Sequence, residues 1–217
     1  MDDYREGEAV KILKYLKSIG IEEIILRESR KTIYDRFVKE VMECKKCPLH
    51  KNRLNPVPGS GPSHARLMII GEAPGEKEDR MGLPFVGPSG QKLTLWLKEV
   101  GINREDVYIT NVVKCRPPHN REPTPEEERM CRPYLEFQID FIKPEVILLL
   151  GNVALGFITG ERKGITRMRG IPFKYRGITI LPTFHPSYVL SNPQKEEVVK
   201  KDFKTLKEIC YGDKNTS

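Results

Sequence analysis

The sequence predicts an α/β protein: a three-layer α/β/α sandwich with a central four-stranded parallel sheet and an N-terminal helical extension. Two observations carry this prediction. Four short apolar runs alternate with longer amphipathic segments, and each run is apolar almost throughout. Strands without a polar face are typical of a parallel sheet that helices cover on both sides. A chain of 217 residues is long enough for one such domain with some residues to spare.

The first part of the chain, residues 1–38, is expected to be the helical extension. Val10, Leu13 and Leu16 recur near helical spacing, and Gly20 is expected to end this helix. The segment KTIYDRFVKEVMEC predicts a second helix, and the turn-rich NPVPGSGPSHA leads into the sheet.

Strands and helices are then expected to alternate through a domain of residues 39–212, with 213–217 as a tail. The predicted strands are ARLMIIG, DVYITNVV, EVILLLG and ITILPTF. The predicted helices are SGQKLTLWLKEVG, TPEEERMCRPYLEFQIDFI, NVALGFITG and the closing NPQKEEVVKKDFKTLKEIC. Thr124 and Glu127 have the spacing of a capping box and Pro125 suits a first helical turn, so a helix is expected to begin there.

The composition limits the class of protein. Hydrophobic residues make up 38% and charged residues 31%, and no apolar stretch approaches the roughly 20 residues that span a bilayer. The N-terminus lacks the apolar segment of a signal peptide, so a cytoplasmic, intracellular location is expected. The net charge of +7 favours an anionic partner. Abundant Lys and Glu with little Gln indicate a thermophile.

The five cysteines of an intracellular chain argue against a disulfide framework. Cys44 and Cys47 form a CxxC whose gap lets both sulfurs reach one metal, and Cys115 and Cys131 lie downstream. Four such ligands suit either tetrahedral zinc or an iron–sulfur cluster, and the spacing does not choose between them. A thioredoxin-type site fits less well, and four unrelated thiols are the remaining alternative. Cys210 lies in an apolar helical pattern and is expected in the core.

Three polar residues mark the ends of predicted strands: Glu72 follows the first, Asn111 ends VYITN in the second, and His185 comes just past the fourth. In parallel sheets ligands bind at the carboxyl ends of the strands, so these side chains are expected around one crevice. The loop GEAPGEKEDRMGLPFVGPSGQ lacks the glycine spacing of a phosphate-binding loop, and its acids would repel a phosphate. The amide of Asn111 could instead pair with a planar, amide-like ligand or serve a turn. Phe85 could be core or a stacking platform.

Taken together, GEAPG, LPFVG, YITNVVKCRPP, LLLG and FHPSY, with the four cysteines, resemble family 4 uracil-DNA glycosylases. These are the iron–sulfur branch of the uracil-DNA glycosylase superfamily, frequent in archaea and thermophilic bacteria. The likeness runs from about residue 39 to about residue 210. It implies a DNA repair enzyme that hydrolyses the N-glycosidic bond of deoxyuridine, releases uracil and leaves an abasic site. It also implies a structural 4Fe–4S cluster on the four cysteines.

The resemblance further implies roles for the residues around the crevice. Phe85 would stack on uracil, and Asn111 would pair with its Watson–Crick edge. His185 would donate a hydrogen bond to a uracil carbonyl as negative charge builds on the leaving base. Glu78 would shape the pocket wall where a 5-methyl group would lie.

This chain differs from several other branches of the superfamily in the residue that would activate the attacking water. They carry an Asp where this sequence has Ala73. By resemblance to family 4, Glu72 and the backbone of Ala73 would position the attacking water.

Uracil-containing DNA, double- or single-stranded, is the expected partner, and basic loops are expected to bind its phosphates. Tyr188, Val189 and Leu190 are candidates for a wedge that fills the space of a flipped base. The expected DNA-binding residues are Lys114, Arg116, Arg167, Arg169, Ser187, Tyr188, Val189 and Leu190.

Two other functions stay open at this point. One is a related glycosylase that also accepts hypoxanthine, and the other is a non-catalytic nucleic-acid-binding module that carries zinc or a cluster. A monomer is expected, with no membrane association, and a sliding-clamp-binding peptide near a terminus is conceivable.

Overall fold

The computed structural model describes residues 29–162 and 164–212. The expected first helix with its end at Gly20, and the tail 213–217, lie outside the described residues. The chain divides into two compact units between residues 36 and 37, inside helix α2 (Arg30–Glu43), which matches the predicted second helix.

Of the first unit, the described part is the beginning of α2. The Ser29 hydroxyl oxygen accepts a hydrogen bond from the backbone N–H of Thr32 at 3.1 Å, which is a typical way to cap a helix N-terminus.

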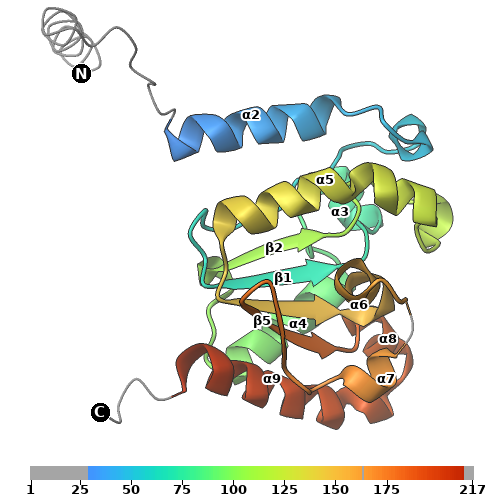
Figure 1. Cartoon of the computed structure of the whole chain (residues 1–217). Helices are drawn as coiled ribbons and strands as arrows, with labels where there is room; N and C mark the ends of the chain where they lie inside the picture. The colour runs from blue at the N-terminus through green and yellow to red at the C-terminus, as the bar shows by residue number, and fades with distance from the viewer. Residues whose placement is uncertain (1–28, 163, 213–217) are drawn as a thin grey trace, which may run out of the picture. The chain divides into compact units, whose positions relative to one another are not determined.

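The second unit is built on a sheet whose strand order is β2-β1-β3-β5-β4 (Figure 1). The first four strands in this order run parallel, as predicted, and β1, β2 and β3 are buried along their whole length. In chain order the strands are β1 (Leu67–Gly71), β2 (Val107–Asn111), β3 (Val146–Leu150), β4 (Phe173–Tyr175) and β5 (Ile178–Thr183).

The predicted number of strands was too small by one. β4 is a three-residue edge strand that pairs antiparallel with β5, and none of its residues is fully buried. A strand this short and this exposed carries no apolar run, so the sequence pattern does not reveal it.

Helices cover both faces of the sheet (Figure 1). Right-handed crossovers place α4 and α5 on opposite faces, because the chain moves in opposite directions across the sheet after β1 and after β2. α9 packs beside α4, with Trp96 and Phe203 5.4 Å apart between ring centroids. The helices of this unit are α3 (Glu76–Met81), α4 (Pro88–Glu99), α5 (Pro125–Ile142), α6 (Gly151–Thr159), α7 (Ile165–Met168), α8 (Pro186–Ser191) and α9 (Glu196–Tyr211).

The four long helices α4, α5, α6 and α9 confirm the predicted ones to within a few residues. The short helices α3, α7 and α8 were not predicted, since four to six residues are too few to show helical periodicity. The predicted capping box is confirmed at the start of α5: the Thr124 hydroxyl accepts from the N–H of Glu127 at 3.2 Å.

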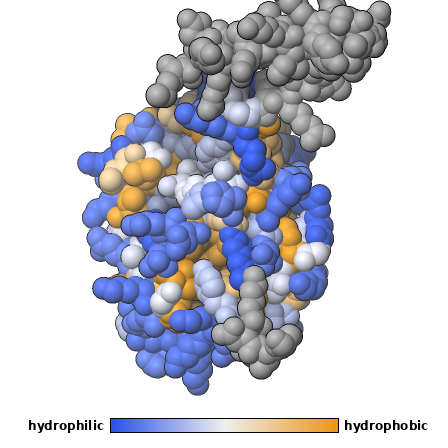
Figure 2. Space-filling model, turned by 90° about the vertical axis from the view of Figure 1, so that its left-hand side faces the viewer, coloured by the Kyte–Doolittle hydropathy of each residue, from blue (hydrophilic) through white to orange (hydrophobic). Residues whose placement is uncertain are grey.

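The surface agrees with the charged composition. Figure 2, which views the end at which the strands begin, shows mostly hydrophilic side chains with smaller hydrophobic areas between them. Within the described ranges, no helix combines the length and the apolar character needed to cross a membrane.

Candidate active site

A pocket lies at the carboxyl ends of the parallel strands, where the sequence predicts it. Gly71 and Asn111, the last residues of β1 and β2, are direct partners in the strand register, so the residues that follow them start side by side. The pocket encloses about 210 Å³. That is below the roughly 300–1,000 Å³ of pockets for drug-sized ligands, so it suits one small ring. We call it the strand-end pocket; its lining residues are Glu72, Ala73, Pro74, Gly75, Glu78, Phe85, Ser89, Asn111, Pro117, Asn120, Arg121, His185 and Ser187.

Asn111 supplies an unsatisfied acceptor to the strand-end pocket. The residue is 1% exposed, and its Oδ1 has no hydrogen-bond partner among the described residues. A buried polar atom without a partner is costly, so this atom is suited to a hydrogen-bond donor on a ligand.

Gly71 makes room for two pocket side chains. A Cβ on this residue would lie 2.5 Å from Oδ1 of Asn111 and 2.5 Å from Cζ of Phe85. Only a residue without a side chain can therefore end β1 at this place.

Phe85 is held in a backbone conformation that is rare outside glycine, with φ of +52°. The Glu78 carboxylate fixes the loop that follows, because its Oε1 accepts from the backbone N–H groups of Val86 at 2.8 Å and Gly87 at 2.7 Å. Such strain persists only where surrounding contacts impose it, and it is common at binding sites. Glu78 therefore positions Phe85 as well as lining the pocket.

His185 lies beside Phe85 in the pocket lining, with 5.8 Å between ring centroids and the ring planes tilted by 39°. Its Nδ1 accepts the backbone N–H of Ser187 at 3.2 Å, since an amide nitrogen can only donate. Burial lowers the pKa of His185 to about 4, although the charge of Glu78 opposes this. The imidazole is therefore neutral near pH 7, and its hydrogen lies on Nε2.

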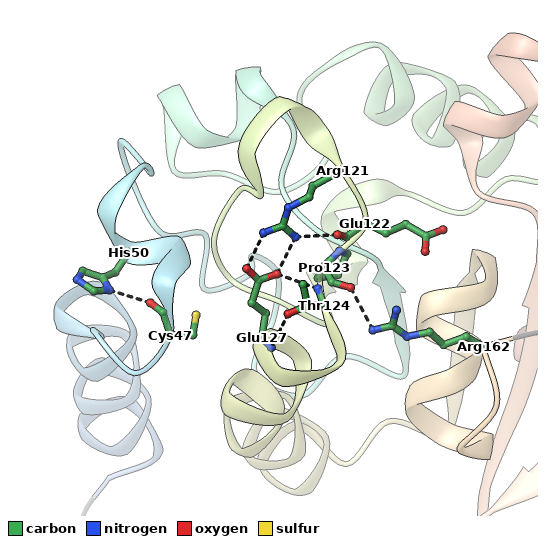
Figure 3. Close-up of polar contacts among 8 residues, drawn as sticks. All are labelled: Cys47, His50, Arg121, Glu122, Pro123, Thr124, Glu127 and Arg162. Carbon is green, nitrogen blue, oxygen red and sulfur yellow. Dashed lines mark hydrogen bonds and ion pairs between the residues drawn. The ribbon is translucent and has the colours of Figure 1, made fainter.

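Glu72 lies directly after β1, and burial raises its pKa to about 7. The negative charges of Glu122 and Glu128 raise it further, and Arg162 opposes them. Arg162 forms an ion pair with Glu128, with 2.6 Å between nitrogen and oxygen. It also donates to the carbonyl of Pro123 at 3.1 Å, which holds the nearby loop (Figure 3). At neutral pH Glu72 is poised between its acid and carboxylate forms.

Comparison with known proteins identifies the family to which this chain belongs. Residues 58–209 match the family described as "Uracil DNA glycosylase superfamily". The chain belongs to the uracil-DNA glycosylase superfamily.

Three relatives show where in the superfamily it lies. A type-4 uracil-DNA glycosylase of Thermotoga maritima is 48% identical over 82% of this chain and 95% of the relative. A type-4 enzyme of Archaeoglobus fulgidus is 45% identical over 81% of this chain and 92% of the relative. A type-5 enzyme of Pyrobaculum aerophilum is 29% identical over 71% and 82% of the two chains. The resemblance to the type-4 branch is confirmed, and these type-4 relatives come from thermophilic bacteria and archaea.

In this superfamily member, the loop after β2 contributes three pocket residues that the sequence did not single out for the pocket: Pro117, Asn120 and Arg121. Both carboxylate oxygens of Glu127 accept from the guanidinium of Arg121, at 2.7 and 2.8 Å (Figure 3). Asn120 has a φ of +55°, which asparagine tolerates better than most residues. The capping box was the sequence signal for this region, and it predicted where the helix begins. It did not predict that its glutamate, Glu127, also holds Arg121 in the pocket wall.

The four cysteines of this superfamily member, Cys44, Cys47, Cys115 and Cys131, line a second cavity, which we call the cysteine cavity. They come from two segments that lie far apart in the chain. No group of three or more His, Cys, Asp or Glu in residues 29–162 and 164–212 is arranged to hold a single metal ion. Cys210 is 1% exposed in α9, which confirms its predicted place in the core.

Burial raises the pKa of three of these thiols, to about 12 for Cys131. The backbone N–H of Lys114 donates to the sulfur of Cys131 at 3.2 Å. Arg53, which the sequence did not point to, donates to the sulfur of Cys115 at 2.8 Å. The cysteine cavity therefore has polar donors aimed at two of its sulfurs.

Two of the expected DNA-binding residues, Lys114 and Val189, are buried, so these two predictions were wrong. Lys114 is 1% exposed, and its ammonium group donates inward to Thr110, to the Asn111 carbonyl and to Gln138. Arg169 is bound by both carboxylate oxygens of Asp202 and by a backbone carbonyl, but 23% of its side chain is exposed, so its DNA contact stays a prediction.

Val189 is 1% exposed because it lies on the inner face of α8, so it cannot act as a wedge. Tyr188 and Leu190 on the same helix are 43% and 46% exposed. Ser187 and Arg167 are also exposed, and Arg116 is partly so. These five residues, like Arg169, stay predictions as DNA contacts.

Proposed function

We propose that this protein hydrolyses the N-glycosidic bond of deoxyuridine in DNA, releasing uracil and leaving an abasic site. The observation that carries the proposal is the unpaired Oδ1 of Asn111, placed in the same small pocket as Phe85 and His185. The names of the type-4 relatives support it.

Asn111 would recognise uracil by its hydrogen-bonding edge. Its Oδ1 accepts the uracil N3–H, and its amide nitrogen donates to O4. Cytosine carries an acceptor at N3 and a donor at C4, so it would leave these buried groups unpaired. Phe85 would stack on the base after it leaves the DNA helix, which recovers part of the stacking energy lost on flipping.

Gly71→Ala tests whether this recognition depends on the room that glycine leaves. We expect uracil release to fall by about 10- to 100-fold, because the new methyl group displaces Asn111 and Phe85 together. Single-turnover rates on a uracil-containing oligonucleotide give the loss. Gly177→Ala is the control: its φ of +84° makes alanine strained, but no side chain lies within 4 Å of the new Cβ. Equal losses of activity in both variants would contradict the prediction.

His185 would stabilise the leaving base. Because Nδ1 accepts the Ser187 N–H, the donor of its neutral imidazole is Nε2–H, which would donate to O2 of uracil as the base becomes anionic. Glu72 would act on the sugar, because its negative charge stabilises the positive charge that C1′ gains as the bond breaks. The water oxygen then bonds to C1′, the electron pair of the C1′–N1 bond leaves with uracil, and the proton of the water passes to Glu72. Ala73 contributes backbone only, so Glu72 is the carboxylate of this step.

The pH dependence should report Glu72. With a pKa of about 7, raised by burial, its active carboxylate form is lost as pH falls. We expect kcat to drop about tenfold per pH unit below that pKa and to level off above it. His185, with a pKa of about 4, should cause no further change of kcat with pH between pH 5 and 9.

The matched variants are Glu72→Gln and, as control, Glu105→Gln at an exposed position. Glu72→Gln should be slow at every pH, with a flat profile, and Glu105→Gln should keep the wild-type profile. If the Glu72→Gln enzyme still loses kcat as the pH falls, the pH dependence belongs to another group.

Cys44, Cys47, Cys115 and Cys131 would hold a structural 4Fe–4S cluster. The chemistry of the donor set fits, because four thiols line one cavity and two already accept polar hydrogens. When bound, the cluster would cross-link the two cysteine segments, and the second segment continues into the pocket loop at Pro117. Iron and sulfide analysis of anaerobically purified protein tests this; stoichiometric zinc would support the other metal.

The DNA would lie over the exposed side chains of Arg116, Arg167, Ser187, Tyr188 and Leu190, with the last two as wedge candidates. A preference for double- or single-stranded DNA, a monomeric state, a sliding-clamp peptide and an intracellular location stay predictions.

The decisive experiment incubates the full chain with an oligonucleotide that contains one uracil, followed by alkaline cleavage of abasic sites. Strand breaks at the uracil support the proposal. DNA binding without breaks would instead support the non-catalytic module. A parallel substrate with hypoxanthine tests the broader glycosylase, which the proposal expects to be released far more slowly.

A further inference from the structure

One arginine side chain connects the two segments that carry the four cysteines. Arg53 Nη1 donates to the sulfur of Cys115 at 2.8 Å. Its Nη2 donates to the backbone carbonyls of Cys44 at 2.8 Å and Met42 at 3.2 Å. Cys115 lies 62 residues further along the chain than Arg53, so this contact joins distant parts of the sequence.

The guanidinium group makes this connection rigid. Its donors lie in one plane with a fixed fork, so the sulfur of Cys115 and the carbonyl of Cys44 are held at a set separation. A lysine could reach one of these acceptors but could not bind all three in the same geometry.

The charge of Arg53 also fits a ligand set of sulfurs. Its hydrogen-bond partners in the described part of the chain are a sulfur and two carbonyls rather than a carboxylate. Four cysteine ligands bring net negative charge to an iron–sulfur cluster, and hydrogen bonds to the sulfurs are among the factors that tune it. Among residues 29–162 and 164–212, the hydrogen-bond donor to the Cys131 sulfur is a neutral backbone N–H, from Lys114.

We propose that Arg53 is a positioning residue for the iron–sulfur cluster, which donates to the Cys115 ligand and locks it to the Cys44 segment, and thereby controls how firmly the cluster is retained. This inference rests on the cluster proposed above. Residues that orient metal ligands through hydrogen bonds typically contribute about 10- to 100-fold to metal affinity.

The test compares Arg53→Met and Arg53→Lys with the wild type, each purified anaerobically as the full chain. Arg66→Met is the matched control, because Arg66 pairs with Glu145. The first readout is the rate at which a chelator removes iron, and we expect Arg53→Met to release it about 10- to 100-fold faster. The second is the resonance Raman spectrum, in which an iron–sulfur(cysteine) stretch should shift to higher frequency when its N–H donor is lost.

The outcomes separate this inference from the cofactor proposal. A wild type without iron and sulfide overturns the cofactor itself. A wild type with the cluster and an Arg53→Met variant with the same release rate and spectrum overturns the role of Arg53 alone. If Arg53→Met does not fold, Arg53→Lys decides: it should show intermediate release and a shifted spectrum, and wild-type behaviour in both readouts overturns the inference.

Discussion

Replacing His185 by alanine is expected to lower kcat for uracil release by about 100- to 1,000-fold and to change KM only slightly. The reason is that Nε2–H meets full negative charge on the base only as the glycosidic bond breaks. The Ser187 N–H bond to Nδ1 and the pKa of about 4 keep the ring neutral with this hydrogen in place. Removing the ring therefore removes stabilisation of the transition state more than of the bound substrate.

Single-turnover rates and DNA affinities, measured on the same uracil oligonucleotide, separate these two effects. His64→Ala, at an exposed position in the connection before β1, is the control and should behave as the wild type. Ser187→Ala removes the hydroxyl 2.7 Å from Nδ1 but keeps the backbone N–H, so its loss should be much smaller. A His185→Ala enzyme that loses affinity but keeps its kcat would assign His185 to DNA binding.

Asn111→Asp is expected to lower uracil release by about 100- to 1,000-fold. The change keeps the size of the side chain but replaces the amide donor with a second acceptor, which then faces the O4 acceptor of uracil. Because Asn111 is 1% exposed, water cannot relieve this mismatch. The ratio of uracil to cytosine release should fall as well, since the exocyclic amine of cytosine can donate to the new oxygen.

Release of each base from matched oligonucleotides measures this ratio, and thermal unfolding checks that the variant is folded. Asn103→Asp, at an exposed position before β2, controls for the added charge. Retention of the wild-type rate and base preference in Asn111→Asp would show that uracil is read by other groups.

Much of the candidate site could be predicted because it follows from the sheet. Apolar strands without a polar face predict parallel pairing, and parallel strands bring their carboxyl ends to one edge. Glu72, Asn111 and His185 each follow or end such a strand, so their meeting in one pocket required only the strand assignments. The register that pairs Gly71 with Asn111 completes the placement.

The predictions that were wrong concern basic side chains and short elements. Lys114 next to Cys115 looks like a DNA contact in the sequence, but it turns inward because Thr110 and Gln138 accept its hydrogens. Val189 lies on the buried face of α8, whereas its neighbours Tyr188 and Leu190 lie on the exposed face. Local sequence does not reveal which acceptors a distant segment supplies or which face of a six-residue helix is covered.

By itself, the amino-acid sequence determined the α/β class, the four parallel strands, the long helices and the residue types at the strand ends, because these depend on the periodicity of apolar residues near in the chain. Only the tertiary structure decided that Glu127 clamps Arg121 in the pocket wall, that Glu78 holds the Phe85 loop, and that Arg53 joins the two cysteine segments. Each of these contacts forms only when a donor and an acceptor come within hydrogen-bond distance. The spacing of residues in the sequence does not say which side chains the fold brings that close together.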